Sequence, residues 1–188
     1  MALPGLLIEY LISGALSLIW LYPLMDRVGI VYRIETQTNT AWTALFVLGL
    51  YFIGMLVDII AWFITRPLKR KLRNEIAAKY GMEYKPVPGT THVRQARFAV
   101  YAPELAKESA MRSSRDRIAR GAIINAVIGT TVYLIISTKI MITLAVGIGL
   151  IVGCFFMWWG FEKVSFGFEL KADEVISQKI EVERKSKP

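Results

Sequence analysis

The sequence predicts an all-α polytopic membrane protein whose four transmembrane helices form two hairpins, joined by a basic helical loop on the cytoplasmic side. Three observations support this fold class. The 188 residues are 54% hydrophobic, above the roughly 45 to 50% that is typical of soluble domains. The apolar residues gather into segments near the length of about 20 that a membrane-spanning helix requires. Most of the positive charges lie between and after these segments.

The first hairpin is predicted within residues 1–64. Its first span covers residues 4–25 and carries one charge, Glu9. Pro23 lies near the end of this span. Because proline lacks the backbone N–H that a helix interior needs, we expect the span to close there.

The second span covers residues 41–64, and its 24 residues contain a single charge, Asp58. Pro67 and a run of lysines and arginines follow at once, so we expect this helix to stop at residues 65–67. The connector between the two spans, residues 26–40, alternates apolar and polar positions and is expected to be extended.

The central segment, residues 65–120, is predicted to be a basic cytoplasmic loop that contains an amphipathic helix over 67–80. Gly81 marks the expected end of that helix. Residues 97–102 are expected to be extended, and Pro103 is expected to begin the next helix. Four cations near the start of the loop are predicted to contact anionic lipid headgroups or a partner: Lys69, Arg70, Lys71 and Arg73.

The second hairpin is predicted within residues 121–160. The third span, 121–137, is the apolar half of a helix that begins in water near Glu104, and its length of about 25 Å is only just enough to cross. A polar break at residues 137–139 precedes the fourth span, 140–160. A continuous helix through this break would bury a lysine, so a tight antiparallel turn is the preferred interpretation.

The C-terminal tail, residues 161–188, is predicted to be a cytoplasmic helix. Ala172, Ile176 and Ile180 share a helical spacing and form an apolar stripe. On an isolated tail this stripe would face water, so we expect either the basic loop or a neighbouring subunit to cover it.

The distribution of lysine and arginine predicts the orientation of the chain. Fourteen of these residues lie in the central segment and six in the tail, against two in the first connector and one in the second. Segments rich in lysine and arginine stay in the cytoplasm. Both termini are therefore predicted to lie inside, with the chain crossing the inner membrane four times.

Two carboxylates inside apolar spans are the sharpest functional signal, because a charge at the centre of a membrane helix costs about 2.5 to 3.5 kcal/mol on insertion scales. Both lie near the predicted cytoplasmic ends of adjacent spans, where the third helix enters the membrane with its arginines. A structural ion-pair network, an ion or proton path, and snorkelling of unpaired side chains are three interpretations of this pattern. We predict an intramembrane polar cluster of Glu9, Asp58, Arg117, Arg120 and Asn125.

Glycines in the fourth span predict close helix packing. Gly149 and Gly153 form a small-xxx-small step, and Gly147 adds a third small residue. The partner helix is either the third span of the same chain or a helix of a second protomer.

No motif of enzyme chemistry is present in the sequence. The chain lacks an HExxH metal motif, a GxSxG nucleophile elbow and a phosphate-binding loop. Its one cysteine, Cys154, lies in an apolar run, and its one histidine, His92, lies in a polar loop without a second ligand beside it. We therefore expect no enzyme activity, cofactor or metal, and the topology alone explains the basic loop without nucleic acid.

Four short helices in contact fill their own centre with side chains, so one chain cannot enclose a wide pore. We expect a small inner-membrane protein that forms a homo-oligomer or joins a larger complex, as a channel-like or scaffolding subunit whose cytoplasmic helices receive a partner or signal. The alternative is a transporter subunit that uses Glu9 and Asp58 for proton or cation coupling. An accessory subunit without a transport role would need neither carboxylate charged.

Overall fold

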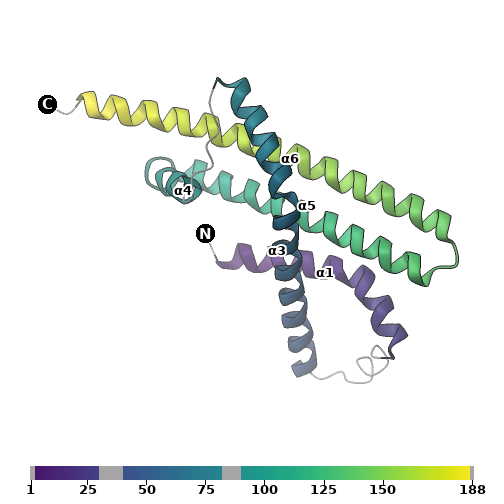
Figure 1. The fold of residues 1–188 in the computed structure, drawn as a ribbon. Helices are drawn as coiled ribbons and strands as arrows, with labels where there is room; N and C mark the ends of the chain where they lie inside the picture. The colour runs from purple at the N-terminus through teal and green to yellow at the C-terminus, as the bar shows by residue number, and fades with distance from the viewer. Residues whose placement is uncertain (1–2, 30–39, 82–89, 187–188) are drawn as a thin grey trace. The chain divides into compact units, whose positions relative to one another are not determined.

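The computed structural model describes residues 3–29, 40–81 and 90–186, and this part of the chain is almost entirely α-helical (Figure 1). Four helices in these ranges contain stretches long and apolar enough to cross a membrane. The prediction of an all-α polytopic membrane protein is therefore confirmed. The helices are α1 (Leu3–Arg27), α3 (Thr40–Lys79), α4 (Thr90–Tyr101), α5 (Pro103–Ile136) and α6 (Ile140–Ser186).

Several helix boundaries lie where the sequence placed them. α5 begins at Pro103, and the break between α5 and α6 is confined to residues 137–139. Gly81 follows the end of α3 with a φ of 67°, a left-handed conformation that glycine adopts without steric cost. Of the predicted extended connector, residues 30–39 lie outside the described residues, and 26–27 belong to the last turn of α1.

The two prolines predicted to end spans lie inside helices, so those two boundaries were wrong. α1 continues through Pro23, and α3 continues through Pro67 for twelve further residues to Lys79. A proline removes one backbone hydrogen bond, and membrane helices tolerate this loss when other groups compensate for it.

One further expectation, that residues 97–102 are extended, was also wrong. Residues 97–101 are helical, as the end of α4, because Phe98 is buried against the apolar stripe of α6. The fourth span and the tail are one helix, since α6 runs without interruption past residue 160. Gly160 and Gly167 lie within it, and single glycines weaken a helix by only about 1 kcal/mol each.

The chain divides into two compact units, and α3, α5 and α6 each contribute to both. Unit 1 contains residues 1–65 and 116–158, and unit 2 contains residues 66–115 and 159–188. Residues 66–115, which are most of the central segment, thus share one unit with the tail.

Unit 1 contains a close helix crossing built on two glycines. A Cβ atom added to Gly14 of α1 would collide with the carbonyl oxygen of Leu50 in α3, and one added to Gly54 of α3 would collide with that of Tyr10 in α1. Only glycine permits this approach of two backbones. In Figure 1, α3 crosses α1 rather than lying alongside it, and residues 41–48 of α3 are exposed.

Unit 2 has hydrophobic cores of its own. One joins α3 to α6 through Leu72, Ile76 and Phe166, and another joins α4 to α6 through Phe98 and Ile176. Ile176 is 1% exposed. The apolar stripe of the tail is therefore buried within its own chain, as one of the two predicted alternatives required, and not left for a neighbouring subunit.

Candidate functional site

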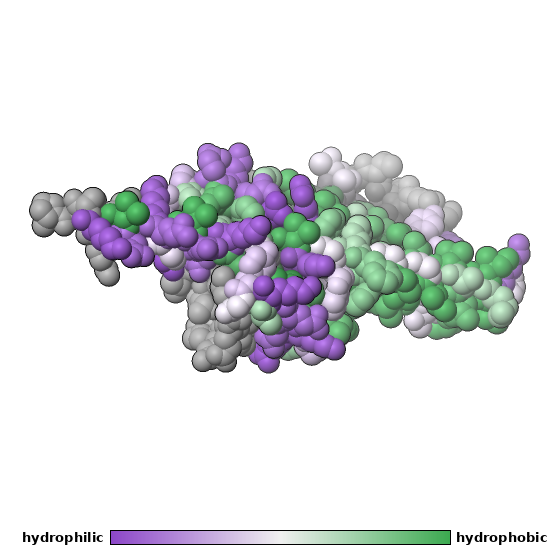
Figure 2. Space-filling view, turned by 90° about the horizontal axis from the view of Figure 1, so that it is seen from above, coloured by the Kyte–Doolittle hydropathy of each residue, from purple (hydrophilic) through white to green (hydrophobic). Residues whose placement is uncertain are grey.

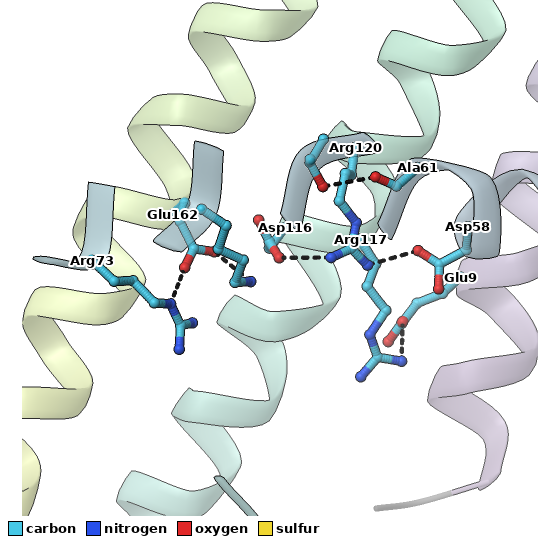
Figure 3. Close-up of polar contacts among 10 residues, drawn as sticks. Glu9, Asp58, Ala61, Arg73, Asp116, Arg117, Arg120 and Glu162 are labelled. Carbon is cyan, nitrogen blue, oxygen red and sulfur yellow. Dashed lines mark hydrogen bonds and ion pairs between the residues drawn. The ribbon is translucent and has the colours of Figure 1, made fainter. Parts of the chain in front are cut away.

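Helix α5 brings two arginines to carboxylates on two other helices of unit 1. Arg117 and Arg120 are three residues apart and so occupy neighbouring faces of α5. Arg117 Nη1 lies 3.1 Å from Glu9 Oε2 of α1, and Arg120 Nη2 lies 2.8 Å from Asp58 Oδ1 of α3 (Figure 3). These two ion pairs join α5 to both α1 and α3.

The ion pairs are largely shielded from solvent. Glu9 is 9% exposed and Arg120 is 5% exposed. Charges removed from water in this way need close partners, because an unpaired buried charge is costly. The arrangement therefore compensates the two carboxylates that made the apolar spans unusual.

Sequence reasoning missed a third carboxylate of this site, Asp116. Its Oδ2 lies 3.8 Å from Arg120 Nη1, and the residue is buried. Asp116 sits in a run of charged residues that is typical of a solvated surface, so its own surroundings gave no sign of burial. The four-residue spacing from Arg120, which places both on one face of α5, is the signal that could have found it.

Asn125 does not join the ion pairs but forms a separate network with α1. Its Oδ1 accepts hydrogen bonds from Ser17 Oγ at 2.8 Å and Trp20 Nε1 at 2.9 Å. Its Nδ2 donates to the carbonyl of Ser13 at 3.0 Å. Eight residues, or about 12 Å of helix, separate Asn125 from Arg117, which is why the two sets of contacts are distinct.

The pairing limits what these carboxylates can do chemically. A guanidinium group already lies against one oxygen of Glu9 and one of Asp58, so an incoming cation would have to compete with it. Within the described ranges, no group of three or more histidine, cysteine or acidic side chains is placed to hold a metal. The geometry thus suits a clamp between helices.

In unit 2, two of the four cations predicted to contact lipid form ion pairs with a carboxylate of the same chain. Lys69 Nζ lies 2.7 Å from Glu162 Oε2, and Arg73 Nε donates to Glu162 Oε1 at 2.5 Å (Figure 3). Glu162 is 1% exposed and was missed, because it follows an aromatic belt where a charge is expected to meet water. Arg70 and Lys71 are exposed, and their contact with lipid or a partner stays a prediction.

The three glycines of α6 that were predicted to pack against another helix divide into two kinds. A Cβ atom on Gly147 would press against the Thr130 side chain of α5, so this glycine serves packing within the chain. Gly149 and Gly153 have no described atom within 4 Å of an added Cβ. Their surface is open on the single chain.

No known protein family, curated protein or solved structure matches the chain. The contacts described above are therefore the basis for assigning a function.

Proposed function

We propose that the protein is a scaffolding subunit of a membrane assembly and that it self-associates through α6. The observation that carries this proposal is the contrast along that helix. Only 6% of its most apolar stretch is buried inside the chain, whereas its continuation past residue 158 contributes to both cores of unit 2.

The contact surface of the proposed assembly is the glycine face of α6, which we define as Ala145, Gly149, Gly153 and Phe156. All four residues are exposed, and the two glycines are open. Figure 2 shows hydrophobic side chains over much of the surface of the α5–α6 hairpin. In lipid such a surface gains little from apolar character alone, so small residues that admit a second helix closely supply the packing contacts.

The charged groups fit a scaffold better than a transporter. Glu9 and Asp58 are each paired with an arginine, which gives proton or cation coupling less support than a role in fixing the register of α1, α3 and α5. Outside the spans, unit 2 offers exposed Arg70 and Lys71 to a partner or to anionic headgroups. Channel-like conduction would require several copies, because four helices leave no wide pore.

Cross-linking between chains tests the proposal. In a Cys154→Ser background, Gly149→Cys should form covalent dimers with a short bis-maleimide in native membranes. Ile148→Cys is the matched control, since it is also exposed but lies about 100° away around the helix. Dimer formation at residue 149 well above that at residue 148 supports the glycine face, and equal or absent dimer formation at both would refute it.

We further propose that both termini face the cytoplasm and that the protein resides in an inner membrane, on the basis of the lysine and arginine distribution. In the same cysteine-free background, Lys139→Cys should react with an impermeant maleimide added outside intact cells. Lys171→Cys should react only after permeabilisation. The opposite pattern would reverse the orientation.

A further inference from the structure

Unit 1 contains an open groove of about 500 Å³ that is lined by three helices, α1, α5 and α6. Leu16 and Ile19 of α1 form one wall. Residues 122–133 of α5 and 142–154 of α6 contribute the others. Its volume lies in the range of about 300 to 1,000 Å³ that holds small-molecule ligands.

The groove has the proportions of a hydrocarbon chain. It follows α5 and α6 over eleven or twelve residues, which at 1.5 Å per residue corresponds to a length of about 17 Å. A volume of about 500 Å³ spread over that length leaves a cross-section of roughly 30 Å². A single extended acyl chain, lying parallel to the helices, fits such a space.

Polar groups are few along the walls of the groove. Ala126, Val146 and Leu150 are representative of the lining, which is mostly apolar. Asn125 also lines the groove, but its oxygen accepts from Ser17 and Trp20. The hydroxyl of Thr130 donates to the carbonyl of Ala126 at 2.7 Å.

One end of the groove lies beside a positive charge at the membrane boundary. Tyr133 and Ile142 line this end, and both flank the turn at residues 137–139 that joins α5 to α6. Lys139 in that turn is exposed, and its carbonyl accepts a hydrogen bond of 3.1 Å from the N–H of Thr143, another lining residue. Figure 2 shows hydrophilic atoms at the tip of the hairpin, next to its hydrophobic flank.

We propose that this groove binds one acyl chain of a membrane phospholipid, with the lipid phosphate at Lys139. The ammonium group supplies the complementary charge at the level of the headgroups, and the chain runs from there along α5 and α6 toward Asn125. The lipid-binding groove and the glycine face lie on different sides of α6, because Gly147 faces α5 while Gly149 lies about 200° away around the helix. A bound lipid and a second protomer can therefore be present together.

Photo-cross-linking in vesicles locates the lipid. The full-length protein is reconstituted in phosphatidylglycerol that carries a diazirine in one acyl chain, irradiated and digested. Cross-links should concentrate in peptides covering 122–133 and 142–154, about tenfold above the exposed apolar residues 45–48 of α3, a ratio equivalent to about 1.4 kcal/mol. Even labelling of the groove and of α3 would overturn the proposal, since ordinary surrounding lipid produces that pattern.

Two pairs of variants test the contacts. Ala126→Phe fills the groove and should lower its labelling about tenfold, whereas Val127→Phe, on an exposed neighbouring position, should leave it unchanged.

Lys139→Glu should reduce the phospholipid retained in native mass spectra several-fold, and Lys163→Glu, which is exposed further along α6, should not. Unchanged labelling in a folded Ala126→Phe protein, or retention of a phosphate-free apolar molecule in place of phospholipid, would overturn the proposal.

Discussion

Two regions of unit 1 both contain glycines in membrane-spanning helices, but only one of them uses these glycines to pack against another helix of the chain. Where α1, α3 and α5 meet, backbones touch at Gly14 and Gly54, and ion pairs hold the contact. In residues 140–158 of α6, glycines are also present, but a Cβ atom added to Gly149 or Gly153 would meet no described atom of another helix within 4 Å. We call the first region the charged crossing and the second the open half of α6.

The comparison shows that a small residue in a membrane helix has no fixed role. At the charged crossing, a missing Cβ lets two backbones approach, and the carboxylate–arginine pairs add contacts that only one register allows. On the open half of α6, the same missing Cβ leaves space that the chain itself does not fill. In lipid, apolar surface alone does not bring helices together, so this space is available to a second helix.

The largest effect is expected from breaking an ion pair at the charged crossing. Asp58→Leu leaves buried Arg120 without its closest described carboxylate and should lower the free energy of unfolding by about 3 to 5 kcal/mol. Asp58→Asn should cost less, because an amide oxygen still accepts a hydrogen bond. Thermal or dodecyl-sulfate unfolding in one detergent measures both.

The control for this change is Ile59→Leu, which alters an exposed neighbour of similar size and should have no effect. Adding Arg120→Met to Asp58→Leu should recover part of the lost stability, because the arginine that has lost its closest carboxylate is removed. The recovery should be incomplete, since buried Asp116 then loses its contact with Arg120. If Asp58→Leu unfolded like the wild type, the ion pairs would not be what holds the crossing.

The next largest effect is expected in the tail, and it tests whether the surface of α6 that is available to a second protomer ends before Ile176. Ile176 is buried against Phe98 in unit 2, so Ile176→Ala should lower the free energy of unfolding by about 2 to 5 kcal/mol without changing the oligomer mass. Val175→Ala, at an exposed position next to it, is the matched control. A fall in oligomer mass at unchanged stability would instead extend the assembly surface into the tail.

Sequence patterns predicted the all-α class and the four membrane-spanning helices, because apolar length and charge are strong local signals. They also placed Glu9 and Asp58 at the level of Arg117 and Arg120, since helix rise and topology together fix depth. The residues at which the helices end were harder to predict. Pro67 changes only one backbone bond, and whether the helix continues depends on contacts further along, which in α3 are the buried Leu72 and Ile76.

The contacts that the sequence did not predict are those made between helices. Gly14 and Gly54 form no motif within either helix, because each faces the backbone of the other, so spacing along one chain segment does not reveal them. Glu162 and Asp116 lie among other charges, and only the fold decides that these two are buried. The tail stripe was correctly identified as apolar, but Phe98, its partner, sits in a segment expected to be extended.

The smallest effect distinguishes the two regions most directly, because the same substitution is made in both. Gly54→Ala puts a methyl group against the carbonyl of Tyr10 and should lower the free energy of unfolding by about 1 to 3 kcal/mol. Gly149→Ala meets open space, and alanine favours a helix over glycine by up to about 1 kcal/mol, so stability should be unchanged or slightly higher. Gly49→Ala, on α3 itself, also meets open space and shows what the substitution does to that helix without a collision. Unfolding curves in a detergent that keeps the protein monomeric give the comparison. Equal stability of all three variants would mean that α1 and α3 can move apart by the width of a methyl group at little cost. A loss of stability in Gly149→Ala alone would place a packed contact on the open half of α6.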